Sequence, residues 1–304
     1  MENKLISILG TTASGKTKLA VNLAAMIGGE ILSADSRQVY RGMDKGSGKD
    51  LEEYQINGIK IPYHLIDIVD AGYEYNVYEY QKDFFEAYNK VIKNQNIPIL
   101  CGGTGMYIES VLKGYRLAKV PRDESLHIRL EKKSNTELRN MLLETRIPHN
   151  LTDHDDTERI IRAIEIDLYY NAHPELTGGD VPKLQSINFG IRYDRSEIRN
   201  KITERLDTRL QEGMIEEVEN LIASGVDPEK LKFYGLEYRY LTQYVLKEID
   251  YTEMFSQLNT AIHQFAKRQD TWWRKMEKSG SRIRWIDGKI SMEEKLAFMI
   301  SQLR

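Results

Sequence analysis

The chain has 304 residues, with 43 Lys or Arg against 46 Asp or Glu, so its formal net charge is −3. That balance excludes a global positive field that would draw the chain onto nucleic acid or a membrane surface, so any nucleic-acid surface must be local. The 41% share of hydrophobic residues excludes a disordered chain, and the single cysteine excludes an intramolecular disulfide and a Cys-rich zinc cluster. No stretch approaches a membrane span of about 20 apolar residues, and we expect a cytoplasmic protein.

The first forty residues predict a strand, a helix and a second strand. Residues 5–9 form a compact apolar run that ends at Gly10, and residues 30–34 form another that ends at Asp35. Between them, apolar side chains recur at helical spacing, at Leu19, Leu23, Met26 and Ile27. This order is typical of a βαβ unit, in which a helix joins two parallel strands.

The alternation of strands and helices continues to residue 105. We expect a third, more polar strand over residues 61–69, and a buried strand over residues 97–101 that a glycine-rich turn closes at residues 102–105. A helical stripe lies between these two strands, at Val77, Tyr80, Phe84, Tyr88 and Val91. The expected fold class is therefore α/β, with a parallel, doubly wound sheet.

Beyond residue 115 the pattern becomes helical. Residues 122–143 and 157–171 have helical character, and strand character returns only at residues 187–193, where we expect the last strand of the sheet. Further amphipathic helices are expected over residues 197–209, 215–223, 236–248 and 254–275. We therefore expect a helical insertion subdomain over residues 115–185, between the two parts of an α/β core, 1–114 and 186–304, that ends in a C-terminal helical layer.

Residues 10–17 carry the sharpest chemical signal. They read Gly-Thr-Thr-Ala-Ser-Gly-Lys-Thr and match the P-loop pattern G-x-x-x-x-G-K-[ST] between a predicted strand and a predicted helix. In such a loop backbone N–H groups converge on a polyphosphate, Lys16 neutralises phosphate oxygens, and the Thr17 hydroxyl can ligate Mg²⁺. The alternative is a glycine-rich turn that binds nothing. The loop leaves the reaction open, because a diphosphate leaving group needs the same donors on phosphorus or on carbon.

A second signal is Asp35, which follows the second predicted strand and so faces the crevice beside the P-loop. Its carboxylate is placed to take a proton from a nucleophile or to hold a metal-bound water, and Ser36, Arg37 and Gln38 add hydrogen-bonding groups. The alternative is a structural aspartate in a turn or helix cap. Thr104 sits at the same predicted sheet edge, where its hydroxyl could donate to a leaving-group oxygen, although its loop also fits a plain tight turn.

Six segments carry a family resemblance. They are GTTASGKT at 10–17, ADSRQVYRGMDKGSGK at 34–49, PYHLIDI at 62–68, CGGTGMYIESVLKG at 101–114, ERIIRAIEI at 158–166 and AKRQDTWWRK at 266–275. Together they resemble the tRNA dimethylallyltransferase family of bacterial type, also called IPP transferases, in order along nearly the whole chain. The resemblance implies a P-loop NTPase-like core and a prenyltransferase. Such an enzyme moves a dimethylallyl group from dimethylallyl diphosphate to the exocyclic amine of the adenosine 3′ of certain tRNA anticodons, using Mg²⁺ and not ATP.

The resemblance also implies roles for residues that match the family's motifs. Asp35 becomes the general base, Lys16 and Thr104 assist departure of the diphosphate, and Thr17 contacts the metal. The P-loop residues implied to hold the diphosphate are Gly10, Thr11, Thr12, Ala13, Ser14, Gly15, Lys16 and Thr17. The residues implied to contact tRNA are Asp35, Ser36, Arg37, Gln38, Thr104, Glu158, Arg159, Ile160, Ile161 and Arg162. We expect a monomer that acts on the anticodon stem-loop, with no membrane partner.

Three positions depart from the family's pattern. Thr11 replaces a proline of the P-loop without removing a phosphate-contacting group, His127 stands where the family usually has an arginine, and Glu237 replaces a basic residue. The His127 departure puts a tRNA or diphosphate contact in doubt, with Arg122 or Arg129 as a candidate substitute. The Glu237 departure could change RNA affinity or the choice of tRNA. Local basic clusters, at residues 192–209 and 267–275, fit an RNA surface or merely solvated helix faces.

Three alternative functions stay open on the sequence. An adenylate-type isopentenyltransferase would share the P-loop and the aspartate. Its free nucleotide substrate would give the long C-terminal helical part no function. A P-loop kinase would consume ATP, and an RNA-binding paralogue with a dead site would need no chemistry. The last alternative predicts loss of Lys16, Thr17, Asp35 or Thr104, and all four are present.

Overall fold

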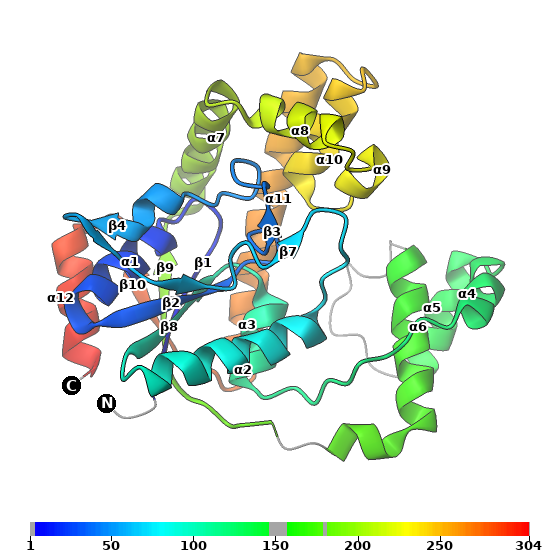
Figure 1. Ribbon diagram of the computed structural model, residues 1–304, viewed down its shortest axis with the longest axis horizontal. Coiled ribbons are helices and arrows are strands. Elements are labelled where there is room, and N and C mark those ends of the chain that lie inside the picture. Colours follow the sequence, from blue (N-terminus) through cyan, green and yellow to red (C-terminus); the bar gives the residue numbers. More distant parts are fainter. Residues whose placement is uncertain (1–3, 146–156, 179–180, 304) are drawn as a thin grey trace. The chain divides into compact units, whose positions relative to one another are not determined.

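A computed structural model describes residues 4–145, 157–178 and 181–303 (Figure 1). It divides the chain into two compact units, which we call the first unit (Met1–Gly114 with Lys183–Arg304) and the second unit (Tyr115–Pro182). The first unit is α/β and contains a central sheet, whereas the described residues of the second unit form only helices and loops.

The central sheet has six parallel strands in the order β10-β9-β1-β8-β2-β6. The strands are β1 (Lys4–Gly10), β2 (Gly29–Ala34), β6 (Tyr63–His64), β8 (Ile97–Gly102), β9 (Gln185–Arg192) and β10 (Ile283–Asp287). Within β1 and β2 every residue except Lys4 is buried, as expected for parallel strands that helices cover on both faces. Outside this sheet, β3 (Tyr40–Arg41) pairs with β7 (Val69–Asp70), and β4 (Gln55–Ile56) pairs with β5 (Ile59–Lys60).

Successive residues of each strand face opposite sides, so the sheet has two cores. One face packs against α1 (Lys16–Ile27), the 3₁₀ helix η1 (Leu51–Tyr54) and α12 (Met292–Leu303), and buries Ile6, Ile8 and Met299. The other face packs against α2 (Val77–Lys93) and α3 (Gly105–Leu112), and buries Leu5, Leu9 and Phe84. These two helix layers account for the doubly wound arrangement.

The C-terminal helices form a separate core beside the sheet. They are α7 (Arg195–Gln211), α8 (Met214–Ala223), α9 (Pro228–Leu231), α10 (Leu236–Val245) and α11 (Tyr251–Lys278). In Figure 1, α11 runs from this layer toward the central sheet. Its first half contributes Leu258 and Ile262 to the helical core, and its second half contributes Trp273 to the sheet core, so α11 ties the two together.

The second unit contains α4 (Glu124–Glu131), α5 (Asn135–Thr145), α6 (Thr157–Ala172) and the 3₁₀ helix η3 (Pro174–Gly178), around a core that includes Leu130, Leu138 and Ile161. The helical character expected over 122–143 resolves into two helices. A capping box separates them, because the Ser134 amide donates to Glu137 (2.8 Å) and the Glu137 amide donates to the Ser134 hydroxyl (3.3 Å).

Two strand predictions are wrong. The strand expected over 61–69 breaks into β6 and β7, because Leu65 and Asp67 adopt positive φ values of 65° and 56°, which an extended strand does not permit. The strand at 185–192 is not the last one, since β10 pairs with it and forms the sheet edge. Its five residues mix Arg284 and Trp285 with apolar ones, which hides the strand signal.

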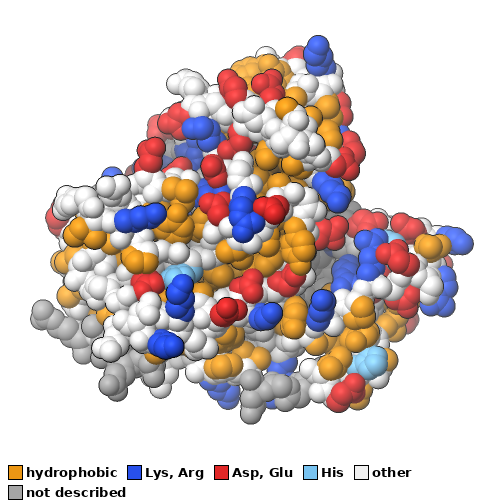
Figure 2. Space-filling view, in the orientation of Figure 1, with side chains coloured by type: hydrophobic (Ala, Val, Ile, Leu, Met, Phe, Trp, Pro, Cys, Tyr) orange, Lys and Arg blue, Asp and Glu red, His pale blue; other side chains and the backbone are white. Residues whose placement is uncertain are grey.

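Two surface properties bear on partners. No helix among the described residues is long and apolar enough to cross a membrane. On the face shown in Figure 2, acidic and basic side chains are interspersed, in keeping with the net charge of −3. Positive charge must therefore be gathered locally wherever an anion binds.

Candidate active site

Three loops that carry predicted site residues leave the sheet at one edge. They follow β1, β8 and β2, which are neighbours in the sheet, and Gly102 is in register with both Leu9 and Ala34. The P-loop, Thr104 and Asp35 therefore share the carboxyl edge of the strands, where open α/β sheets bind ligands. The structure brings together the three groups that the sequence pointed to in this unit.

The P-loop connects β1 to α1, which begins at Lys16. Within it the Lys16 ammonium donates to the Thr11 carbonyl at 3.3 Å, and the buried Ser14 hydroxyl has no hydrogen-bond partner in the described structure. Desolvation lowers the pKa of Lys16, an effect that the nearby Arg205 and Arg209 add to and Asp35 opposes. An unpaired hydroxyl and a desolvated ammonium are the groups that a phosphate would satisfy.

The loops that carry Asp35 and Thr104 are hydrogen-bonded to each other through the neighbours of Asp35. The Thr104 hydroxyl oxygen accepts from the Ser36 amide at 3.0 Å, and the Thr104 amide donates to the Ala34 carbonyl at 3.1 Å. The Asp35 Oδ1 accepts from the Arg37 amide at 2.9 Å. Asp35 therefore does stabilise a turn, but this role uses only one carboxylate oxygen. The other, Oδ2, has no hydrogen bond within the described residues.

Close backbone contact explains why glycine stands at position 102. A Cβ atom there would lie 2.2 Å from the Ala34 carbonyl oxygen, which no side chain can tolerate. The approach lets the Thr104 loop pack directly on the Asp35 loop. The glycine-rich turn is therefore more than a simple chain reversal, because it sets the spacing between two candidate catalytic groups.

Gln38 has a different environment from the one implied for a substrate contact. Its carbonyl oxygen accepts from the Ser33 hydroxyl at 2.8 Å, and its amide nitrogen donates to the Gly48 carbonyl at 3.1 Å. The side chain is buried. Gln38 thus braces the loop that follows β3, whereas Ser36 and Arg37 remain partly exposed.

Gln269, which lies on α11 within the AKRQDTWWRK segment, connects two loops of the site. Its carbonyl oxygen accepts from the Thr12 amide at 2.8 Å, and its amide nitrogen donates to the Gly103 carbonyl at 2.9 Å. The side chain is buried, so these bonds are shielded from water. One amide group therefore joins the P-loop to the Thr104 loop. The sequence feature that could have identified Gln269 is an uncharged polar residue within an otherwise charged helix segment.

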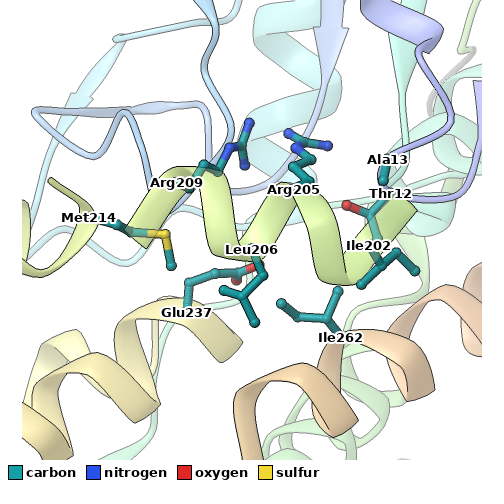
Figure 3. A pocket seen from close by; sticks show the side chains of 9 residues that line it. All are labelled: Thr12, Ala13, Ile202, Arg205, Leu206, Arg209, Met214, Glu237 and Ile262. Atoms are coloured by element: carbon teal, nitrogen blue, oxygen red, sulfur yellow. The ribbon is translucent and has the colours of Figure 1, made fainter. Parts of the chain in front are cut away.

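A pocket opens beside the P-loop, between it and the C-terminal helices (Figure 3). It is lined by Thr12, Ala13, Ile202, Arg205, Leu206, Arg209, Met214, Glu237 and Ile262. Arg205 and Arg209 project from the same side of α7, one turn apart. Asp50 holds them, because both of its oxygens accept from Arg209 (2.8 and 3.0 Å) and one lies 3.6 Å from Arg205. Pattern reasoning placed both arginines in an ambiguous basic cluster.

Glu237, the acidic departure from the family pattern, also lines this pocket. Burial raises the pKa of its carboxyl group, while Arg209, Arg205 and Arg37 act in the opposite direction. The exchange of a basic for an acidic residue therefore alters the wall of this pocket. Its effect on RNA affinity or tRNA choice, which the sequence raised, stays a prediction.

The implied tRNA-contacting segment 158–162 belongs to the second unit, on α6. Ile160 and Ile161 are buried in that unit's core, so only Glu158, Arg159 and Arg162 present side chains to solvent. The Arg162 guanidinium donates to Glu165 (2.8 Å) and to the Val120 carbonyl (2.7 Å). The two isoleucines support the segment and do not offer side chains to a ligand.

His127 is also a core residue of the second unit. It is 5% exposed, its Nδ1 lies 2.8 Å from Glu165, and its Nε2 lies 3.1 Å from the Arg122 guanidinium. Glu131 and Glu158 complete a cluster with metal-ligand spacing. The guanidinium of Arg122 already supplies positive charge there, so the cluster is accounted for without an ion.

Thr17 is the P-loop residue that fits a hard divalent cation. Its hydroxyl offers the oxygen ligand that Mg²⁺ prefers, from the first turn of α1. The neighbouring Cys101 interacts with Thr17, and burial raises the pKa of that thiol to about 12, so it stays protonated and does not compete as a thiolate ligand. The donor set suits Mg²⁺ held by one hydroxyl, phosphate oxygens and water.

A P-loop at the edge of a parallel sheet, with two arginines in the adjoining pocket, is the arrangement of an α/β protein of the P-loop class. A family model described as IPP transferase matches residues 38–276. The chain is 55% identical to tRNA dimethylallyltransferase 2 of Bacteroides fragilis over 99% of its length and 98% of that protein. It is 54% identical to tRNA dimethylallyltransferase 1 of Parabacteroides distasonis, over 97% and 95%.

Among solved structures, the tRNA isopentenylpyrophosphate transferase of Bacillus halodurans superposes with a TM-score of 0.72 at 29% identity, covering 99% of this chain and 95% of that one. The chain belongs to the IPP transferase family, the tRNA dimethylallyltransferases. It is therefore a prenyltransferase with a P-loop NTPase-like fold.

Proposed function

We propose that this enzyme transfers a dimethylallyl group from dimethylallyl diphosphate to the exocyclic amine of the adenosine 3′ of the anticodon in tRNA. The observation that carries the proposal is the meeting of the P-loop, Thr104 and Asp35 at the ends of three neighbouring strands. A cradle for a leaving diphosphate and a carboxylate for the incoming amine then lie on either side of one reacting carbon.

The diphosphate is assigned to the P-loop and the cations around it. Lys16, the Ser14 hydroxyl and the backbone amides face it from the loop, and Arg205 and Arg209 face it from α7. Thr17 would hold Mg²⁺, which when bound supplies charge neutralisation at the diphosphate oxygens. The apolar lining of the same pocket, from Ile202, Leu206, Met214 and Ile262, suits a five-carbon prenyl chain.

Asp35 is assigned as general base. As the amine nitrogen forms its bond to the allylic carbon, the carbon–oxygen bond to diphosphate breaks, and the nitrogen must lose one proton. The free Oδ2 of Asp35 takes that proton, while Oδ1 stays bonded to the Arg37 amide and fixes the carboxylate's orientation. Diphosphate leaves with the electron pair of the broken bond.

Thr104 is assigned to the leaving group. Its oxygen already accepts from the Ser36 amide, and its hydroxyl proton has only a long contact of 3.4 Å to the Ser36 hydroxyl. That proton is therefore free to turn toward the bridging oxygen of the prenyl diphosphate. A hydrogen bond there stabilises the charge that develops as the carbon–oxygen bond breaks.

Recognition of tRNA is assigned to residues 35–38 and 158–162. The target adenosine must leave its stack to reach a carbon enclosed beside the P-loop, which an anticodon loop permits more readily than a duplex does. We assign the partly exposed Asp35, Ser36 and Arg37 to the extruded base, and the buried Gln38 supports their loop. Glu158, Arg159 and Arg162 offer polar side chains on α6. Ile160 and Ile161 support this segment by packing in the core of the second unit.

Mass spectrometry of prenylated products tests the proposal. The purified protein is incubated with Mg²⁺ and dimethylallyl diphosphate, and in parallel with an unmodified anticodon stem-loop, AMP or ATP. We expect the stem-loop alone to gain the mass of one dimethylallyl group. Addition to AMP would instead indicate an adenylate-type enzyme. Hydrolysis of ATP without any prenyl transfer would contradict the assignment and favour a kinase.

A further inference from the structure

A loop of the first unit folds around a carboxylate from a distant helix. We call residues 44–50, which follow β3, the 44–50 loop. The amides of Asp44 and Lys45 donate to one oxygen of Glu217 on α8, at 2.8 and 2.7 Å, and the amide of Gly46 donates to the other at 3.1 Å. Successive backbone N–H groups that converge on one anion form a nest, and here the anion is part of the protein.

The Glu217 carboxylate is held from its other side as well. The hydroxyl of Tyr238, a fully buried residue of α10, donates to it at 2.7 Å. Four donors thus fix a charged group that lies between the loop and two helices. A carboxylate with this many short, charge-assisted bonds has one orientation, and it imposes that orientation on the backbone of the loop.

The far end of the same loop contacts two arginines that line the pocket beside the P-loop. Asp50, its last residue, makes the paired bonds to Arg209 and approaches Arg205. Just before it, Gly48 packs so tightly on the arginines that a Cβ atom would meet the Arg205 guanidinium at 2.4 Å. The buried Lys49 ammonium donates to the Tyr40 carbonyl at 2.8 Å, so the loop is pinned along its length.

We propose that Glu217 is a positioning residue for diphosphate binding: it holds the 44–50 loop so that Asp50 presents Arg209 and Arg205 to the P-loop pocket. The inference rests on the proposed function, since it takes these two arginines as diphosphate ligands. Glu217 itself lines no part of the pocket. Its influence runs through the loop backbone to Asp50, and from there to the guanidinium groups.

Simple electrostatics and the proposed positioning role predict opposite changes in anion affinity when the Glu217 charge is removed, which makes the proposal testable. Removing a negative charge from the protein should strengthen the binding of an anion if charge alone matters. If Glu217 positions the arginines, its removal should weaken that binding. Glu219, on the same helix, provides the matched control, because it is exposed and its side chain makes no hydrogen bond or ion pair within the described residues.

Calorimetric titration with inorganic pyrophosphate and Mg²⁺ measures the effect on the full chain, below the onset of thermal unfolding. We expect Glu217→Gln to raise the Kd about tenfold, because the neutral amide cannot accept at the position of one carboxylate oxygen, and each of those oxygens accepts two hydrogen bonds. Glu219→Gln should leave the Kd unchanged or slightly lower. Equal Kd values for Glu217→Gln and wild type would overturn the inference. Absence of pyrophosphate binding by the wild type would instead overturn the proposed diphosphate site.

A double-mutant cycle tests the route through Asp50. Asp50→Asn should weaken pyrophosphate binding, and Glu217→Gln should add nothing further in that background, because both changes release the same arginines. Additive losses would show that Glu217 acts elsewhere and would overturn the proposed route. Tyr238→Phe, which keeps the ring and removes one of the four donors, should weaken binding less than Glu217→Gln does and without global unfolding. A melting curve for each variant establishes that the folded protein is being titrated.

Discussion

Asp35 uses its two carboxylate oxygens differently, and this allows its roles to be separated. Asparagine at position 35 keeps an oxygen for the Arg37 amide but cannot accept a proton. We expect Asp35→Asn to leave the Kd for pyrophosphate within about twofold of wild type and to reduce turnover by about 10²–10⁴, the usual contribution of a general base. Single-turnover prenylation and pyrophosphate titration measure the two quantities. Equal loss of both would contradict the assignment as base.

Lys16 makes diphosphate binding sensitive to alkaline pH. Because desolvation lowers its pKa from the usual 10.5, the ammonium loses its proton at a lower pH than an exposed lysine would. The charge that attracts diphosphate is present below the lowered pKa and is lost as the pH rises through it. We expect pyrophosphate affinity to begin to fall at a pH below 10.5.

Lys16→Met provides the comparison for this pH profile. It should bind pyrophosphate weakly at every pH. Its affinity should not show the alkaline fall that is due to Lys16, since no proton is left to dissociate at position 16. A profile for wild type that is flat up to pH 10.5, or one that Lys16→Met reproduces, would contradict the role of the Lys16 charge.

Sequence reasoning located the parts of the site that are local in the chain. The P-loop, Asp35 and Thr104 each lie in a strand-to-loop junction, so a motif and a predicted strand are enough to place them at one edge. Arg205, Arg209 and Gln269 come from helices far along the chain, and nothing in their local spacing says which face meets the P-loop. The charged sequence around the two arginines is equally typical of a helix whose charged face is exposed to solvent.

The helix α11 links two site loops through one side chain, and its removal should affect both. Gln269→Ala takes the acceptor from the Thr12 amide and the donor from the Gly103 carbonyl, which leaves a part-buried amide and a buried carbonyl unpaired. We expect a loss of about 2–4 kcal/mol in the free energy of unfolding and weaker pyrophosphate binding. Denaturant unfolding and calorimetry measure these effects.

A conservative variant at the same position separates the two bonds. Gln269→Glu keeps an acceptor for the Thr12 amide and loses the donor to Gly103. It should retain more pyrophosphate affinity than Gln269→Ala, because the P-loop backbone stays held. If the two variants bind equally, the Thr12 bond does not order the P-loop.

The elements that sequence patterns missed share a physical cause. The strand β10 is short and carries Arg284 and Trp285, so it has neither the length nor the alternation of a strand signal, and its place comes from pairing with β9. The residues 61–69 have strand-like composition, yet two positive φ values turn the chain between β6 and β7. Strongly periodic segments such as α2 and α11 were found, because their apolar stripes do not depend on distant partners.

The sheet is stabilised from both faces, and the C-terminal helix α12 supplies part of one face. Met299 is fully buried there against β-strand side chains, whereas Met26 on α1 is 61% exposed. We expect Met299→Ala to lower the free energy of unfolding by about 2–5 kcal/mol, as core truncations do. Met26→Ala should change it by less than about 0.5 kcal/mol. Comparable losses for the two variants would contradict a tightly packed core under α12.

The strand order also dictates when the core can close during synthesis. β1 lies between β8 and β9, and the whole second unit is encoded between those two neighbours. At about 5–20 residues per second, the ribosome needs several seconds after β8 to deliver β9. Through that interval one edge of the strand that carries the P-loop has no partner, and an open parallel edge invites pairing with other chains. Nascent chains stalled before β9 should therefore recruit chaperones more strongly than those stalled after it.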